Sequence, residues 1–258
     1  MGFFVQSRAL RALVLACGLA SVGTASSLRA ETLIFSATQT IEKSAEPFGL
    51  FVSPLASGGL REKWLGVQRR LEDEMVQLAL CEGDRDGCAS PAALQFLDIV
   101  DAAKAREGRA RLGEINRAVN LAIRPVSDLA QYGRIDVWAS PLATLARGAG
   151  DCEDYAIAKF VALRRAGVAP DDLRIVIMHD PVRDEDHAIT AARLDGRWLT
   201  LDNRRMAMVE DVYLSSYRPI FLIDAEGVKG YRDAMPEGED QQVASIVAPQ
   251  AATNLSPM

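Results

Sequence analysis

Apolar residues recur at helical spacing along the first half of the chain. Residues 62–80 predict an amphipathic helix, because apolar positions return every three or four residues against a charged remainder. Ser90 and Pro91 predict the start of a second helix, since an N-cap residue followed by proline is a start signal. Residues 109–123 repeat the helical pattern and predict a third helix. Residues 31–60 lack any such period and predict an irregular segment.

The pattern changes in the second half to short apolar or alternating runs. Four of these runs, separated by Pro, Gly and Asp, predict strands at residues 174–178, 187–194, 197–202 and 220–223. Asp195 and Gly196 lie between the second and third runs and predict a two-residue hairpin loop. Helices followed by an antiparallel sheet indicate an α+β domain with the N-terminal helices packed on the sheet.

The sequence GAGDCEDYAIAKF, residues 148–160, lies between these two halves. Ser140 and Pro141 predict a short helix that ends at Gly148. Asp151 is then placed as the N-cap of a further helix, with Cys152 in its first turn. The partial positive charge of a helix N-terminus favours a thiolate below the free cysteine pKa of about 8.5. Cys152 is therefore a candidate nucleophile at a helix N-terminus.

Three carboxylates flank this cysteine, namely Asp151, Glu153 and Asp154. Neighbouring anions disfavour a thiolate and oppose the effect of the helix terminus. A bound cation would remove this conflict, and Ca²⁺ is the ion that prefers such oxygen ligands in irregular geometry. The alternative is that Asp151 and Asp154 cap the helix while Glu153 faces water. The spacing alone leaves both interpretations open.

The N-terminal 30 residues have the pattern of a secretory signal peptide. Arg8 and Arg11 precede an apolar run that is followed by small residues. Loss of this segment, with its three arginines and no acidic residue, moves the formal net charge from -6 to -9. A chain this acidic is a poor partner for nucleic acid. No later segment is apolar enough over sufficient length to cross a membrane.

The remaining chain is predicted to form one folded domain followed by a tail. Residues 31–232 have the composition of an ordinary globular domain. Residues 233–258 contain few large apolar side chains and predict a disordered tail.

In an oxidising compartment, Cys81 and Cys88 could close the short polar loop between them into a disulfide. Cys152 is then the odd cysteine, which marks it as a reactive thiol.

The candidate bases for Cys152 are the two histidines of the chain, His179 and His187. A two-residue hairpin at Asp195 and Gly196 makes His187 the diagonal neighbour of Asp202 on the same face, within reach of its side chain. This pairing would supply the acid of a cysteine-histidine-aspartate triad. His179 has Asp180 beside it and stays an alternative. Taken singly, each of these residues is also compatible with a surface or turn position.

The motifs around these residues resemble a known family. GDCEDYAIAKFVALRRAG, HDPVRDEDHAI and DGRWLTLDN, followed by SYRPIFLID, are similar to the bacterial transglutaminase-like cysteine peptidases, the group of LapG-like periplasmic adhesin proteases. The likeness extends over about residues 48–224. It implies a papain-like, transglutaminase-like core in which Cys152 is the nucleophile, His187 the general base and Asp202 the orienting acid.

The resemblance also implies a cofactor, partners and a location. It implies a calcium ion held beside the nucleophile by Asp151, Glu153 and Asp154, and Asp136 is a further candidate ligand. Well-known members of the family cut a large cell-surface adhesin in the periplasm and are sequestered by an inner-membrane cyclic-di-GMP receptor. The expected function is therefore a periplasmic, calcium-dependent cysteine endopeptidase that acts on a protein substrate such as a biofilm adhesin.

Two other functions are compatible with the sequence. The first is a transglutaminase or another acyltransferase, because the step that forms a thioester is shared with peptidases. The second is a non-enzymatic periplasmic regulatory module that has kept the fold. The presence of all three candidate triad residues argues against this second alternative.

Overall fold

The computed structural model describes residues 43–232. The six α-helices are α1 Gly59–Gly83, α2 Pro91–Lys104, α3 Gly108–Ala122, α4 Asp128–Tyr132, α5 Pro141–Arg147 and α6 Cys152–Arg165. The predicted signal peptide and the predicted tail lie outside these residues, as does the start of the irregular segment. None of the helices within residues 43–232 is long and apolar enough to span a membrane.

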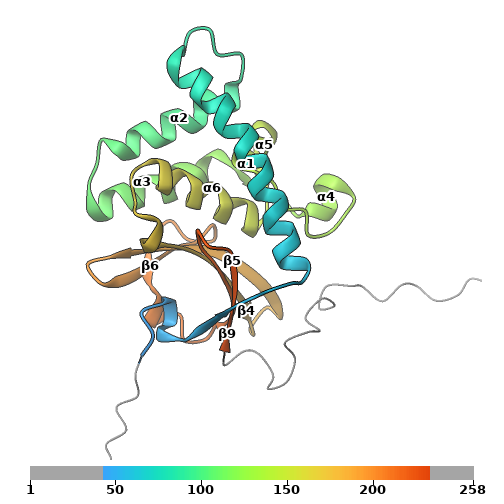
Figure 1. The fold of residues 1–258 in the computed structure, drawn as a ribbon, viewed down its shortest axis with the longest axis vertical. Coiled ribbons are helices and arrows are strands. Elements are labelled where there is room, and N and C mark those ends of the chain that lie inside the picture. Colours follow the sequence, from blue (N-terminus) through green and yellow to red (C-terminus); the bar gives the residue numbers. More distant parts are fainter. Residues whose placement is uncertain (1–42, 233–258) are drawn as a thin grey trace, which may run out of the picture. The chain divides into compact units, whose positions relative to one another are not determined.

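Seven strands form one antiparallel sheet. They are β1 Val52–Pro54, β4 Leu173–Asp180, β5 Glu185–Leu194, β6 Arg197–Leu201, β7 Val209–Glu210, β8 Arg218–Ile223 and β9 Val228–Tyr231. The strand order in the sheet is β1-β9-β8-β4-β5-β6-β7. A separate parallel pair joins β2 Arg124–Pro125 to β3 Ala149–Gly150. Helices α2, α3 and α6 lie together on one side of the sheet (Figure 1).

The central strands of the sheet are buried on both faces. Ile175 and Ala188 belong to the core that the helices share with the sheet, whereas Val176 and Ile189 belong to a second cluster on the opposite face. Successive side chains of a strand point to opposite faces, so a strand covered on both sides has a continuous apolar run. This explains the unbroken apolar run IVIM at residues 175–178.

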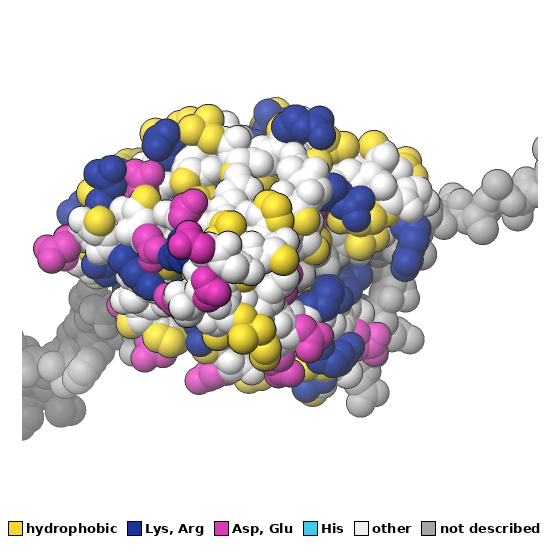
Figure 2. Space-filling model, turned by 90° about the horizontal axis from the view of Figure 1, so that it is seen from above, with side chains coloured by type: hydrophobic (Ala, Val, Ile, Leu, Met, Phe, Trp, Pro, Cys, Tyr) yellow, Lys and Arg dark blue, Asp and Glu magenta, His cyan; other side chains and the backbone are white. Residues whose placement is uncertain are grey.

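The surface on the helical side has mixed charge. Acidic and basic side chains lie among one another there, with hydrophobic side chains scattered between them (Figure 2). The net negative charge of the chain is therefore not gathered into a single acidic patch in this view.

The predicted helices and strands are confirmed, and the fold is an α+β transglutaminase-like core. The disulfide that the sequence allows between Cys81 and Cys88 is formed, at the end of α1. The prediction of an irregular segment before residue 60 is wrong in one respect, because Val52–Pro54 forms strand β1 and pairs with β9. That partner lies almost at the other end of the domain, so no local pattern indicates the pairing.

Helix α2 begins where its N-cap residue predicts. The Ser90 hydroxyl accepts a hydrogen bond of 3.2 Å from the backbone N–H of Ala93, and Pro91 follows as the first helical residue. This bond satisfies one of the N–H groups that a helix start leaves without an intrahelical partner. The cap fixes the point at which the chain enters the helical layer.

We expect Ser90→Ala to lower the free energy of unfolding by about 1 kcal/mol, because it removes this capping acceptor. Urea denaturation monitored by circular dichroism measures the change. Ser127→Ala is the matched control, since Ser127 is the N-cap of α4 but its side chain makes no capping hydrogen bond. The control is expected to change stability by less than about 0.5 kcal/mol. An equal loss in both variants would contradict the assignment.

Candidate active site

Helix α6 places Cys152 at its first residue. The helix is buried from Glu153 to Leu163 without interruption, so it is packed on all sides rather than along one stripe. The Thr190 hydroxyl on β5 donates a hydrogen bond of 2.7 Å to the carbonyl of Ala156, which joins the helix directly to the sheet. Cys152 is thereby held at a fixed place beside strand β5, as the only free cysteine of the described chain.

The hairpin between β5 and β6 brings His187 to Asp202, as its loop predicts. Leu194 pairs with Arg197, and the register continues to the pair of Thr190 with Leu201. The Nε2 atom of His187 lies 2.8 Å from Oδ1 of Asp202. His187 is fully buried and Asp202 nearly so. The predicted contact is therefore confirmed. His179 lies one register position away on β4, where it pairs with Asp186 and contacts its carboxylate.

The loop after β6 is fixed around the carboxyl group of Asp202. Oδ1 of this residue also accepts a hydrogen bond of 3.0 Å from the backbone N–H of Arg204. Asn120 on α3 donates to the Asp202 carbonyl at 3.0 Å. Burial acts to raise the pKa of Asp202, but the hydrogen bonds from His187 and Arg204 and the charges of His187 and Lys159 together outweigh it and hold the pKa below its ordinary value. Asp202 is thus an ionised, oriented acceptor.

The other ring nitrogen of His187 is available to accept a proton. Nδ1 is buried and has no hydrogen-bond partner within residues 43–232. The backbone N–H of the next residue, Ala188, approaches the sulfur of Cys152 and acts to lower its pKa. An imidazole anchored at Nε2 by a carboxylate, with Nδ1 unpaired and the next residue against a cysteine sulfur, is suited to act as a general base.

The thiol of Cys152 is not bonded to His187 in this structure. Its Sγ donates instead to Oε2 of Glu153 at 3.3 Å. Burial raises the pKa of Cys152 well above its ordinary value, and the Glu153 carboxylate raises it further. Both effects favour the neutral thiol of Cys152.

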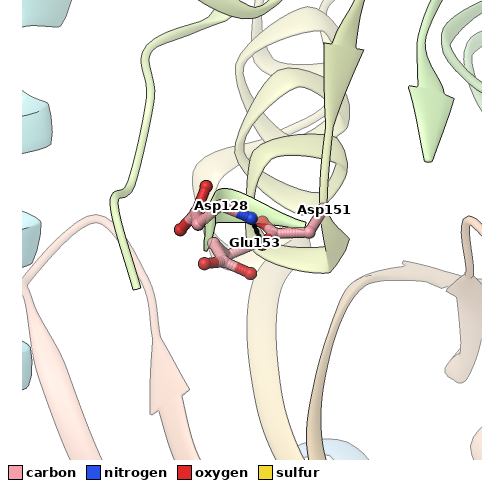
Figure 3. Close-up of side chains that lie close together, drawn as sticks. All are labelled: Asp128, Asp151 and Glu153. Atoms are coloured by element: carbon pink, nitrogen blue, oxygen red, sulfur yellow. Dashed lines mark hydrogen bonds between the residues drawn. The ribbon is translucent and has the colours of Figure 1, made fainter. Parts of the chain in front are cut away.

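Three carboxyl groups converge beside Cys152, and we call them the acidic cluster. Its members are Asp128, Asp151 and Glu153, and one oxygen of each lies within 4.8 Å of the others. Figure 3 shows the three side chains directed toward one another at the start of α6. The parallel pairing of Pro125 with Gly150 brings the segment before α4 alongside the start of α6. This pairing is why Asp128 meets Asp151.

The acidic cluster has the chemistry of a calcium site. Oδ1 of Asp128 and Oδ1 of Asp151 are buried and unpaired among the residues that the structure describes. Burial, together with the neighbouring carboxylate of Asp151, raises the pKa of Glu153 to about 9. Buried carboxylate oxygens without donors are the ligands that Ca²⁺ takes. The residues present therefore fit a divalent cation.

Two of the three predicted calcium ligands, Asp151 and Glu153, belong to this cluster, whereas Asp154 lies outside it. The Asp154 carboxylate accepts a hydrogen bond of 2.8 Å from the backbone N–H of Ala139. Asp136 pairs with Lys63 and accepts from the indole of Trp138. Both carboxylates thus hold the loop that precedes α5.

Asp128 was not predicted, and the alternative capping role of Asp151 is only partly correct. Asp151 stands at the N-cap position with extended backbone angles, but its side chain makes no capping bond. Its Oδ2 accepts a hydrogen bond of 3.2 Å from the N–H of Asp128 instead. The sequence signal that could have indicated Asp128 is Ser127 before a short apolar stretch, a weak helix start in a loop rich in polar residues.

Comparison with known proteins shows which family the chain matches. The sequence model of a family described as bacterial transglutaminase-like cysteine proteinase BTLCP matches residues 74–222. That range contains Cys152, His187, Asp202 and the acidic cluster. No curated protein matches the chain.

Several solved structures share the fold. LapG of Legionella pneumophila is 22% identical with a TM-score of 0.51, and the match covers 62% of this chain and 87% of that one. Its EGTA-treated form is 22% identical with a TM-score of 0.50, covering 63% and 91%. Its calcium-bound form is 23% identical with a TM-score of 0.49, covering 60% and 82%. At such identities the first two matches establish a common fold.

We expect the stability of the calcium-free protein to fall as the pH rises. The folded-state pKa of Glu153, about 9, lies above its ordinary value of 4.5, so this group stabilises the fold fully only below about pH 4.5. That stability is lost as the pH rises through the folded-state pKa. Urea denaturation in a chelator should therefore give a loss of about 2 kcal/mol between roughly pH 6 and pH 8.

The Glu153→Gln variant is expected to reduce this slope, because the amide does not titrate; Asp154, whose pKa burial raises to about 7, accounts for the part that remains below pH 7. Glu62→Gln is the matched control on the exposed first turn of α1 and should keep the wild-type slope. The same slope in Glu153→Gln as in the wild type would show that another group is responsible.

Proposed function

Since the chain belongs to the bacterial transglutaminase-like cysteine proteinases, we propose that it is a calcium-dependent cysteine endopeptidase with a triad of Cys152, His187 and Asp202. The cysteine peptidase activity follows from the family. The observation that carries the triad is the 2.8 Å contact between His187 Nε2 and Asp202 Oδ1, which leaves Nδ1 open beside the α6 N-terminus.

The proposed reaction begins with proton transfer from the Cys152 thiol to Nδ1 of His187. The thiolate then attacks the substrate carbonyl carbon, and backbone N–H groups of the first turn of α6 stabilise the oxyanion. The imidazolium gives its proton to the leaving amine as the C–N bond breaks. Water, activated by His187, hydrolyses the thioester and restores the thiol.

Asp202 has two roles in this scheme. Its carboxylate fixes the imidazole in the tautomer that carries the proton on Nε2, so that Nδ1 is the free base. It also stabilises the imidazolium that forms when His187 accepts the thiol proton. The hydrogen bonds from Arg204 and Asn120 to this residue hold the carboxyl group in place for both roles.

Calcium is proposed to bind at the acidic cluster of Asp128, Asp151 and Glu153. A bound Ca²⁺ supplies positive charge that neutralises the carboxylates beside the thiol and lowers their cost to the thiolate. The support for this proposal is the pair of buried, unpaired oxygens on Asp128 and Asp151. Glu153, engaged as a ligand, would no longer compete with His187 for the thiol proton.

The substrate and location are proposed from the family. We propose a periplasmic enzyme that is exported by the signal peptide and cuts a surface protein of the adhesin class. Sequestration by a cyclic-di-GMP receptor of the inner membrane is proposed on the same basis. A peptidase acts on protein, so the substrate class is restricted to polypeptides.

We expect the mature protein to cleave an adhesin fragment that is exposed in the periplasm, and Cys152→Ala or His187→Ala to reduce turnover by at least about 1,000-fold. Mass spectrometry of new N-termini measures cleavage. His179→Ala is the matched control and should keep wild-type turnover, because His179 contacts Asp186 rather than the proposed triad. Full activity in either triad variant would falsify the triad. Amine-labelled product without new N-termini would indicate acyl transfer instead.

We also expect calcium to raise the melting temperature by about 5 °C or more when it is present at about 100 times its dissociation constant. Asp128→Asn should lose most of this shift, because it removes one carboxylate of the acidic cluster. Asp136→Asn is the matched control, since its carboxylate pairs with Lys63 outside the cluster. Scanning calorimetry with and without a chelator measures both. Loss of the shift in Asp136→Asn but not in Asp128→Asn would place the ion elsewhere.

A further inference from the structure

A lysine lies fully buried behind the proposed triad. Lys159 is on helix α6, two turns after Cys152, and none of its surface is exposed. Lysine is rarely buried to this degree unless its ammonium is paired, because removing a charge from water is costly. The family reaction described above gives it no task. Its burial therefore calls for a specific interaction.

The surroundings of the ammonium are almost entirely neutral. Nζ of Lys159 donates a hydrogen bond of 3.4 Å to the carbonyl of Leu201, the residue before Asp202. It also lies 5.7 Å from the ring centroid of Tyr155, one turn earlier on the same helix. Among the described residues, Asp202 is the charged group whose field acts on Lys159. His187, bonded to Asp202, is the next titratable group in this buried set.

The ammonium of Lys159 changes the net charge of the buried group that it forms with His187 and Asp202. With His187 neutral, the His187–Asp202 pair carries one negative charge away from water. Such a net charge is unfavourable in a protein interior, and protonation of the imidazole would cancel it. A lysine ammonium cancels it without using the imidazole. Lys159 therefore allows Asp202 to be ionised while His187 remains an unprotonated base.

We propose that Lys159 is a positioning residue that supplies the buried counter-charge of Asp202 and thereby keeps His187 available as a base. The proposal rests on the proposed function where it concerns catalysis. The charge interaction between Lys159 and Asp202 can be tested without a substrate. Burial lowers the pKa of Lys159 to about 7, and the Asp202 carboxylate opposes this. The ammonium form is accordingly present at and below neutral pH.

Nuclear magnetic resonance of the imidazoles tests the proposal directly. The chain has only two histidines, so the His187 signal is identified by its loss in His187→Ala. The expected result for Lys159→Met is a His187 titration midpoint about one pH unit higher than in the wild type. Lys159→Arg, which keeps the charge, should restore the midpoint. The His179 signal serves as an internal reference and should not move.

A control variant and a reciprocal measurement complete the test. Lys104→Met removes an exposed lysine at the end of α2 and should leave the His187 midpoint unchanged. The reciprocal experiment follows the Lys159 side-chain carbon next to Nζ in Asp202→Asn, where the midpoint of Lys159 should fall by about one unit. It requires no change at Lys159, so it decides the matter even where Lys159→Met fails to fold.

Unchanged midpoints would overturn the proposal. If His187 titrates alike in Lys159→Met and the wild type, or if Lys159 titrates alike in Asp202→Asn and the wild type, Lys159 is only a packing residue. These outcomes are distinct from failure of the proposed function. If the wild-type protein is inactive but the two midpoints still change in the variants, Lys159 is the counter-charge of Asp202 and only the proposed function is wrong.

Discussion

The packing of helix α6 against the sheet is the constraint on which the site depends. An uninterrupted buried run from Glu153 to Leu163 allows the helix neither rotation nor sliding without opening the core. The bond from Thr190 to the Ala156 carbonyl sets its position along β5. Cys152 at the first residue and Lys159 two turns later therefore stand at fixed places relative to the β5–β6 hairpin. The hairpin in turn carries both His187 and Asp202.

The local features of this arrangement follow from the sequence. Asp195 and Gly196 have φ values of 51° and 75°, which a two-residue hairpin requires and which these residue types accept. Once such a loop is given, the register of β5 and β6 is determined, and with it the contact of His187 with Asp202. The start of α2 is equally local, because Ser90 and Pro91 define it within a single turn.

The features that could not be predicted are those made by distant segments. Strand β1 exists because Val52 pairs with Tyr231, and neither stretch has a period that indicates a partner. Asp128 joins the acidic cluster because the two-residue pairing of β2 with β3 brings it to Asp151, which is 23 positions later. Asp151 stands at the N-cap position of α6, but its side chain makes no capping bond, for the same reason. Its carboxylate accepts a hydrogen bond from the backbone N–H of Asp128 instead, a contact that the local sequence does not indicate.

The acidic cluster at the start of α6 and the buried lysine in its middle act on the same electrostatic problem. A thiolate and its base need different local charge: negative groups beside Cys152 oppose ionisation, whereas a negative group beside His187 promotes its protonated form. In this structure the thiol is bonded to Glu153, and Nδ1 of His187 has no partner among the described residues. Positive charge at the acidic cluster would free the thiol, and positive charge at Lys159 keeps the base neutral. In the proposed reaction both positive charges are needed for proton transfer from Cys152 to His187. Helix α6, which carries the proposed nucleophile, therefore also carries Glu153 of the acidic cluster and Lys159.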